Sequence, residues 1–145
     1  MDSSGNENQW SYSDAVNLKT YAEDANKRTE WALESLEIAI GGSASFKAKN
    51  YQYAIEYIKM AKNHLTKMKT LADGKAELPL TGGNHATLQE KINHAIELCN
   101  EIVVLIITTN NYSTYENKIN SVVLQLDIEC LNLQTLGIEL IGKFS

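Results

Sequence analysis

Apolar residues in this chain recur at alternating steps of three and four along four long segments, and this spacing constrains the fold more than any other feature. Such a period puts the apolar side chains on one face of an α-helix. The segments cover residues 13–39, 50–72, 87–106 and 113–144. A single proline in 145 residues leaves each of them free to be continuous helix. The sequence therefore predicts four amphipathic helices.

The predicted core is the apolar stripe of each segment. Small residues dominate the first stripe, which would let a neighbouring helix approach closely. The four stripes together comprise Ala15, Leu18, Ala22, Ala25, Thr29, Ala32, Leu36 and Ala39; Tyr51, Ala54, Ile58, Ala61, Leu65, Met68 and Ala72; Leu88, Ile92, Ala95, Cys99, Ile102, Val103 and Ile106; and Ile119, Val122, Val123, Leu126, Cys130, Leu133, Leu136, Leu140 and Phe144.

Capping residues predict where the helices begin. Ser13 precedes the first stripe as an N-cap, and Asn50 is the candidate cap of the second, with residues 43–49 able to add a further turn. Residues 87–90 and 113–116 each read as a capping box, in which a Ser or Thr side chain and a Glu side chain satisfy each other's free backbone donors.

Two runs are also compatible with β-strands. Residues 102–109 are rich in β-branched side chains, and residues 122–134 alternate apolar and polar, so the two could form a hairpin. The capping boxes and the persistent three/four spacing favour helix in both runs.

Four helices with one apolar face each predict an all-α, up-and-down four-helix bundle. We assign residues 13–145 to this single domain and residues 1–12 to a flexible, polar N-terminus. The connection at residues 73–86 is about 14 residues long, which is enough for one crossover loop at the end of the bundle or for a functional loop.

Residues 78–82 in this connection, Leu-Pro-Leu-Thr-Gly, resemble the sorting signal of proteins that sortases attach to cell walls. Such a signal is followed by an apolar span and a basic tail, whereas a predicted amphipathic helix follows here. We therefore interpret the stretch as a turn between the two halves of the fold.

The distribution of charge and of apolar residues argues against nucleic acid and membranes as partners. The net charge is −5, yet residues 43–75 carry seven lysines against two acids. The basic stretch contains no arginine, which argues against a nucleic-acid surface. The longest apolar run, Ile102–Ile107, falls short of the roughly 20 residues that span a bilayer, and the polar N-terminus does not resemble a secretory signal. We expect neither nucleic acid nor a membrane as partner.

The two cysteines indicate a reducing compartment. If the last two helices fold back at residues 110–111, Cys99 lies opposite position 122, about 12 Å along the helix from Cys130. A disulfide needs Cα atoms about 4.4–6.8 Å apart. We therefore expect two buried, reduced thiols and a cytoplasmic protein.

No constellation in the sequence predicts catalysis or a cofactor. Glu90, His94, Glu97 and Glu101 share one face of the third segment, but this face lies opposite the apolar stripe and no other segment repeats the pattern. We interpret it as a solvated polar face rather than a metal site. The sequence contains no phosphate-binding loop and no nucleophile elbow. We predict that the protein is not an enzyme.

The stretch HLTKMKTLADG, residues 64–74, resembles the phosphoacceptor region of histidine-phosphotransfer domains, which are also four-helix bundles. The resemblance implies that His64 accepts a phosphoryl group and that Lys67, one turn later, balances its charge. Those domains have glycine and small residues directly after the lysine, whereas this chain has Met68, Lys69 and Thr70.

The surplus of apolar residues on the last two segments favours a protein-interaction function. The fourth segment carries a second apolar set outside its main stripe: Leu124, Ile128, Leu131, Ile138 and Ile141. Surplus apolar surface of this kind commonly marks an interface. We predict a small helical bundle that associates with itself or with a partner protein through the third and fourth helices. A phosphotransfer protein, with His64 as acceptor, and an acidic immunity or inhibitor protein are the alternatives.

Overall fold

The computed structural model describes residues 9–39, 42–80, 85–108 and 112–145. Nearly all of these residues lie in four α-helices: α2 (Tyr12–Ala39), α3 (Ala44–Asp73), α4 (His85–Thr108) and α5 (Tyr112–Lys143). None of the described residues forms a β-strand. The helical interpretation of residues 102–108 and 122–134 is confirmed, and the alternative hairpin is wrong.

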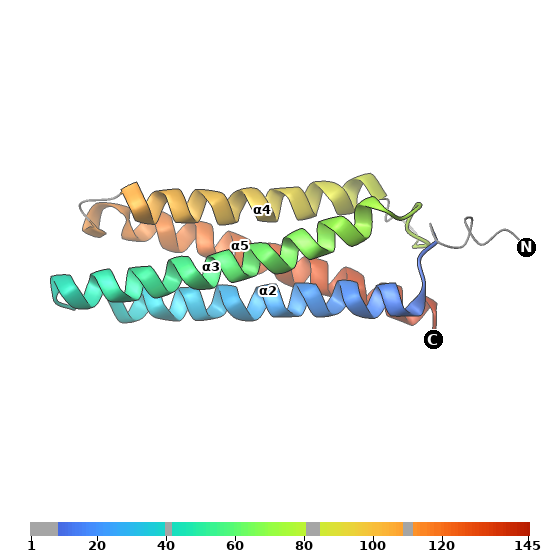
Figure 1. Cartoon of the computed structure of the whole chain (residues 1–145), viewed down its shortest axis with the longest axis horizontal. Coiled ribbons are helices and arrows are strands. Elements are labelled where there is room, and N and C mark those ends of the chain that lie inside the picture. Colours follow the sequence, from blue (N-terminus) through green and yellow to red (C-terminus); the bar gives the residue numbers. More distant parts are fainter. Residues whose placement is uncertain (1–8, 40–41, 81–84, 109–111) are drawn as a thin grey trace, which may run out of the picture.

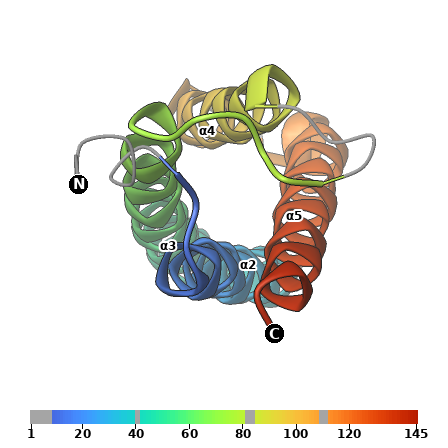
Figure 2. The ribbon, with the colours of Figure 1, turned by 90° about the vertical axis from the view of Figure 1, so that its right-hand side faces the viewer.

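The four helices form an up-and-down bundle, as the sequence predicts. Successive helices run in opposite directions, and α2 begins at the same end of the bundle at which α5 finishes (Figure 1). Viewed along its axis the bundle is a ring in the order α2, α3, α4, α5 (Figure 2). Among the described residues α2 packs on α3 and α5, and α4 packs on the same two helices.

The N-cap of α2 lies two residues before Ser13, the predicted cap. The N-cap is Ser11, whose hydroxyl accepts a hydrogen bond from the backbone N–H of Asp14 at 3.2 Å, while the Asp14 carboxylate accepts from the backbone N–H of Ser11 at 3.0 Å. This reciprocal pair is a capping box that uses aspartate. Asp14 also forms an ion pair with Lys75 at 2.9 Å, so a tertiary contact supports Ser11 as the cap.

The starts of the next two helices also differ from the prediction. Ser43 caps α3 and accepts a hydrogen bond from the N–H of Phe46, so Asn50 lies inside the helix, where its amide donates to the Phe46 carbonyl at 3.0 Å. α4 begins at His85 rather than at residue 87, because the side chain of Glu77, from the preceding loop, accepts from the backbone N–H of His85 at 2.6 Å. The second predicted capping box, at residues 113–116, stays a prediction, because the side chain of Ser113 lies outside those that the structure describes.

The predicted stripes form the core with few exceptions. Every predicted core residue of α2 and α3 is buried. On α4 and α5 the exceptions are Val103 and Leu136, which are half-buried, and Phe144, which lies just beyond the last helical residue and is exposed. The buried alanines at positions 15, 22, 25, 32 and 39 give α2 a slim inner face, so α3 and α5 pack closely against it.

The connection between α3 and α4 covers one end of the core. Residues 74–80 run from α3 across the end of the bundle toward α5 (Figure 2), and Leu78 is buried there. Trp10, which we assigned to the flexible N-terminus, is also buried at this end and donates from its indole N–H to the carbonyl of Ala76 at 2.9 Å. The loop joins two adjacent helices, so the long connection is a cap on the core and not a crossover between non-adjacent helices. Residues 1–8 of the predicted N-terminal segment lie outside the described residues.

Gly137 lies at a close approach between α5 and α2. A Cβ atom at this position would lie 2.7 Å from the Cα atom and 2.8 Å from the backbone nitrogen of Lys19. These are backbone atoms of α2, so they can move away from an added methyl group only if the whole helix moves. Gly142, on the same helix, has nothing within 4 Å of the corresponding position.

The two glycines therefore predict opposite effects of the same substitution. Gly137→Ala should lower the free energy of unfolding by about 1–3 kcal/mol, because it forces α2 and α5 apart. Gly142→Ala should raise it by up to about 1 kcal/mol, because alanine favours the helix. Urea denaturation followed by circular dichroism measures both, and equal stabilities of the two variants would contradict this account of the α2–α5 contact.

Candidate functional site

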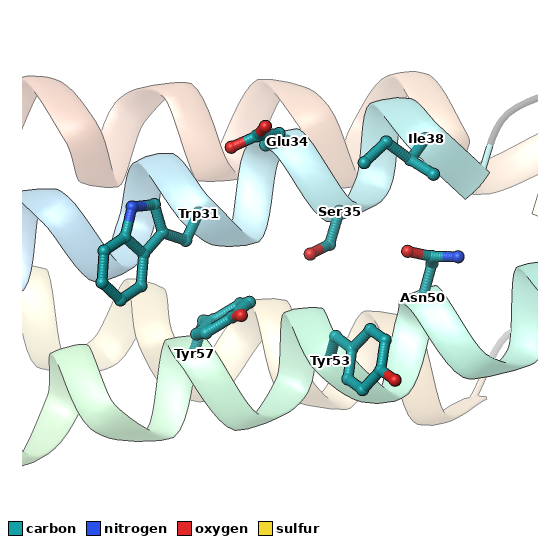
Figure 3. A pocket seen from close by; sticks show the side chains of 7 residues that line it. All are labelled: Trp31, Glu34, Ser35, Ile38, Asn50, Tyr53 and Tyr57. Atoms are coloured by element: carbon teal, nitrogen blue, oxygen red, sulfur yellow. The ribbon is translucent and has the colours of Figure 1, made fainter.

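An aromatic groove runs along the surface between α2 and α3. It has a volume of about 450 Å³. Figure 3 shows Trp31 and Ile38 at its two ends on the α2 side, with Tyr57 and Tyr53 following one another along α3. The groove is further lined by Glu34, Ser35 and Asn50. We refer to these seven residues as the aromatic groove.

Two of its rings meet at a steep angle. The centroids of Trp31 and Tyr57 are 5.6 Å apart and their planes are inclined by 70°. This is an edge-to-face contact, which the quadrupoles of aromatic rings favour. The guanidinium carbon of Arg28 lies 4.3 Å from the centroid of Trp31. The ammonium of Lys49 lies 5.8 Å from the centroid of Tyr53. Each helix therefore supplies a cation to a ring of the groove.

Polar groups form the floor of the groove. Ser35 and Asn50 are both buried at its base. Because the Asn50 amide nitrogen donates to the Phe46 carbonyl, its carbonyl oxygen is the atom that faces the groove, as Figure 3 shows. The carboxylate of Glu34 points along α2 toward the Trp31 end. The groove thus combines aromatic surface with several hydrogen-bond acceptors.

His64 and Lys67, the residues of the phosphotransfer hypothesis, lie further along α3. His64 is half-buried, and its Nδ1 atom is buried without a hydrogen-bond partner among the described residues. Burial lowers the pKa of His64; Asp24 opposes this change, while Lys67 and Arg28 add to it. Lys67 is exposed and lines a second hollow with Tyr21. The imidazole is therefore partly buried near Asp24 and Arg28 of α2 rather than free on the surface.

A smaller slot separates α3 from α4. It has a volume of about 290 Å³, with Lys59 and Lys62 beside an apolar surface formed by Ile58, Cys99, Val103 and Val104. Cys99 and Cys130 are free and buried, as predicted. Burial raises the pKa of each thiol to about 12. At neutral pH both remain protonated, which makes them poor nucleophiles and poor metal ligands.

The second apolar set of α5 lies on the outside of the bundle. Leu124, Ile128, Leu131 and Ile138 are 48%, 56%, 44% and 51% exposed, and Ile141 is half-buried. On α4 the exposed apolar residues include Val104, which borders the slot toward α3. Ile107 is the other large apolar residue of α4 that is exposed among the described residues.

The acidic face of α4 is solvated, as predicted, since Glu90, His94, Glu97 and Glu101 are all exposed. Within the described ranges no group of three or more His, Cys, Asp or Glu side chains is arranged to hold a metal ion. None of the described helices is both long enough and apolar enough to cross a membrane.

Comparisons with known proteins give no assignment. No protein-family model matches the sequence, and neither the curated proteins nor the solved structures contain a significant match. The function must therefore be argued from the surfaces themselves.

The aromatic groove is not predicted by the sequence. Its tyrosines are spaced four residues apart on α3, which is a detectable signal, but Trp31 is far away in sequence. Only the rotation of α2 and α3 about their axes brings the three rings together.

The cysteines provide a test of the packing. We expect Cys99 and Cys130 to react with a colorimetric disulfide reagent at least about 100-fold more slowly in the native protein than in urea, because both thiols are buried and protonated. Ser45→Cys, which puts a thiol at an exposed position on α3, is the control and should react at once. Rapid labelling of either native cysteine would contradict the packing around α4 and α5.

Proposed function

We propose that the protein acts by protein–protein association rather than by catalysis, and that its interface is the outer face of α5. The supporting observation is the row Leu124, Ile128, Leu131 and Ile138, each about half exposed. Together with Thr135 this row keeps steps of four and three, which is the spacing of a coiled-coil seam. It extends for about 21 Å along the helix. We call it the α5 seam.

The most exposed residues of this stretch of α5 carry no charge. From Ser121 to Ile138 all exposed residues are uncharged, although charged residues make up 21% of the chain. The two acids in the interval, Asp127 and Glu129, are half-buried, and Asp127 accepts a hydrogen bond from Asn26 at 2.6 Å. On such a face two molecules of net charge −5 can meet without bringing fully exposed like charges together. This favours a second copy of the chain as the occupant.

Leu131 lies midway between two other members of the seam. Leu124 and Ile138 lie seven residues before and after it, about 10.5 Å away on each side. Two antiparallel copies of α5 would pair Leu131 with its counterpart and Leu124 with Ile138 of the partner. Because the seam is short, we expect a dissociation constant on the order of micromolar.

Sedimentation velocity across about 1 µM to 1 mM protein tests the proposal. The wild-type protein should shift from monomer to dimer within this range. Leu131→Glu should remain monomeric, because two carboxylates would face each other at the centre of the interface. Met60→Glu is the matched control: Met60 is 45% exposed, against 44% for Leu131, but it lies on α3.

Two results would contradict the proposal. One is a wild-type protein that stays monomeric throughout the range. The other is equal weakening of the dimer by Met60→Glu and Leu131→Glu, which would show that the interface lies elsewhere or is non-specific. Circular dichroism confirms that both variants are folded.

A further inference from the structure

We propose that the aromatic groove between α2 and α3 binds a small methylated ammonium cation, of the chemical class of choline. This site is separate from the α5 seam and does not depend on it. The proposal rests on the rings and on the acceptor groups beside them.

The rings of the groove suit a cation. Trp31 and Tyr57 are inclined by 70° with centroids 5.6 Å apart, so they form two sides of a corner, and Tyr53 lies one helical turn from Tyr57. The face of each ring carries negative electrostatic potential, and tryptophan attracts cations most strongly. Rings at a steep angle allow one cation to contact more than one of them.

The polar lining supplies hydrogen-bond acceptors. The hydroxyl of Ser35 and the carbonyl oxygen of Asn50 lie between α2 and α3, whereas the carboxylate of Glu34, which also lines the groove, lies on the side of α2 away from α3 (Figure 3). Arg28 and Lys49 already place cations against Trp31 and Tyr53, so a cationic ligand competes with Arg28 for the ring of Trp31.

The protein's own cations show which kind of ammonium fits. Arg28 already stacks on Trp31 at 4.3 Å, and Lys49 approaches Tyr53 only to 5.8 Å. A primary ammonium is strongly hydrated and needs hydrogen-bond partners for three N–H groups, so it stays at the rim. A methylated ammonium has no such requirement and presents methyl groups to the rings. The volume of about 450 Å³ accepts such a head group with a short substituent.

The two tryptophans of the chain provide the assay. In isotope-labelled protein, choline should shift the indole N–H signal of Trp31 and leave that of Trp10 unchanged, because Trp10 is buried at the end of the bundle and bonded to Ala76. We expect a dissociation constant on the order of 0.1–1 mM. Neohexyl alcohol has the same shape as choline without the charge and should bind at least about tenfold more weakly.

A pair of variants on α2 tests the carboxylate. Glu34→Gln should weaken choline binding by roughly three- to tenfold. Glu37→Gln is the matched control, since Glu37 is exposed on the same helix but does not line the groove, and it should have no effect. Both positions are exposed, so neither change threatens the fold.

Four results would overturn the proposal: equal binding of choline and neohexyl alcohol, equal shifts of both indole signals, no shift of the Trp31 signal, or equal affinities of the Glu34→Gln and Glu37→Gln variants. A peptide containing trimethyllysine distinguishes the source of the cation. Tighter binding of choline than of the peptide supports a small-molecule ligand. If the peptide binds more than tenfold more tightly than choline, the small-molecule assignment is overturned and the ligand of the groove is a modified protein.

Discussion

The close packing of α2 against α3 and α5 is the contact on which the rest of the structure depends. Buried alanines along α2, from Ala15 to Ala39, keep its inner face slim. Helices whose contacts are made by small residues approach until backbone meets backbone, as Gly137 and Lys19 do. By contrast, α4 packs through larger residues such as Leu88, Ile92 and Ile102. The helix axes are therefore packed more closely around α2 than around α4.

The two proposed sites have different origins. Leu124, Ile128, Leu131 and Ile138 lie outside the main apolar stripe of α5, so the helical period leaves them exposed. Beside α2, the small residue Ser35 lies between large aromatic neighbours and leaves a hollow that the rings border.

The sequence predicted what depends on periodicity and missed what depends on tertiary position. Four helices and nearly all of their core residues follow from the three/four spacing, because burial of one face dominates the energetics of an amphipathic helix. The helix starts were misplaced because Ser11 and Ser13 are both good caps by sequence, and the ion pair between Asp14 and Lys75 supports only the first. Similarly, Glu77 reaches His85 from a loop that no local pattern describes. The exposure of the α5 seam was predictable from its spacing, whereas the aromatic groove required the relative rotation of two helices.

The central claim, that two copies meet through antiparallel α5 helices, is tested most directly by cysteine cross-linking at the symmetry axis. The native thiols are buried, so an added surface cysteine is the reactive one. Under mild oxidation Leu131→Cys should give a covalent dimer as a single variant, because residue 131 faces its own counterpart, and Leu124→Cys should form one only when mixed with Ile138→Cys. The account would be contradicted if Leu131→Cys gave no more covalent dimer than Met60→Cys on the opposite side of the molecule, or if Leu124→Cys cross-linked to itself as readily as to Ile138→Cys.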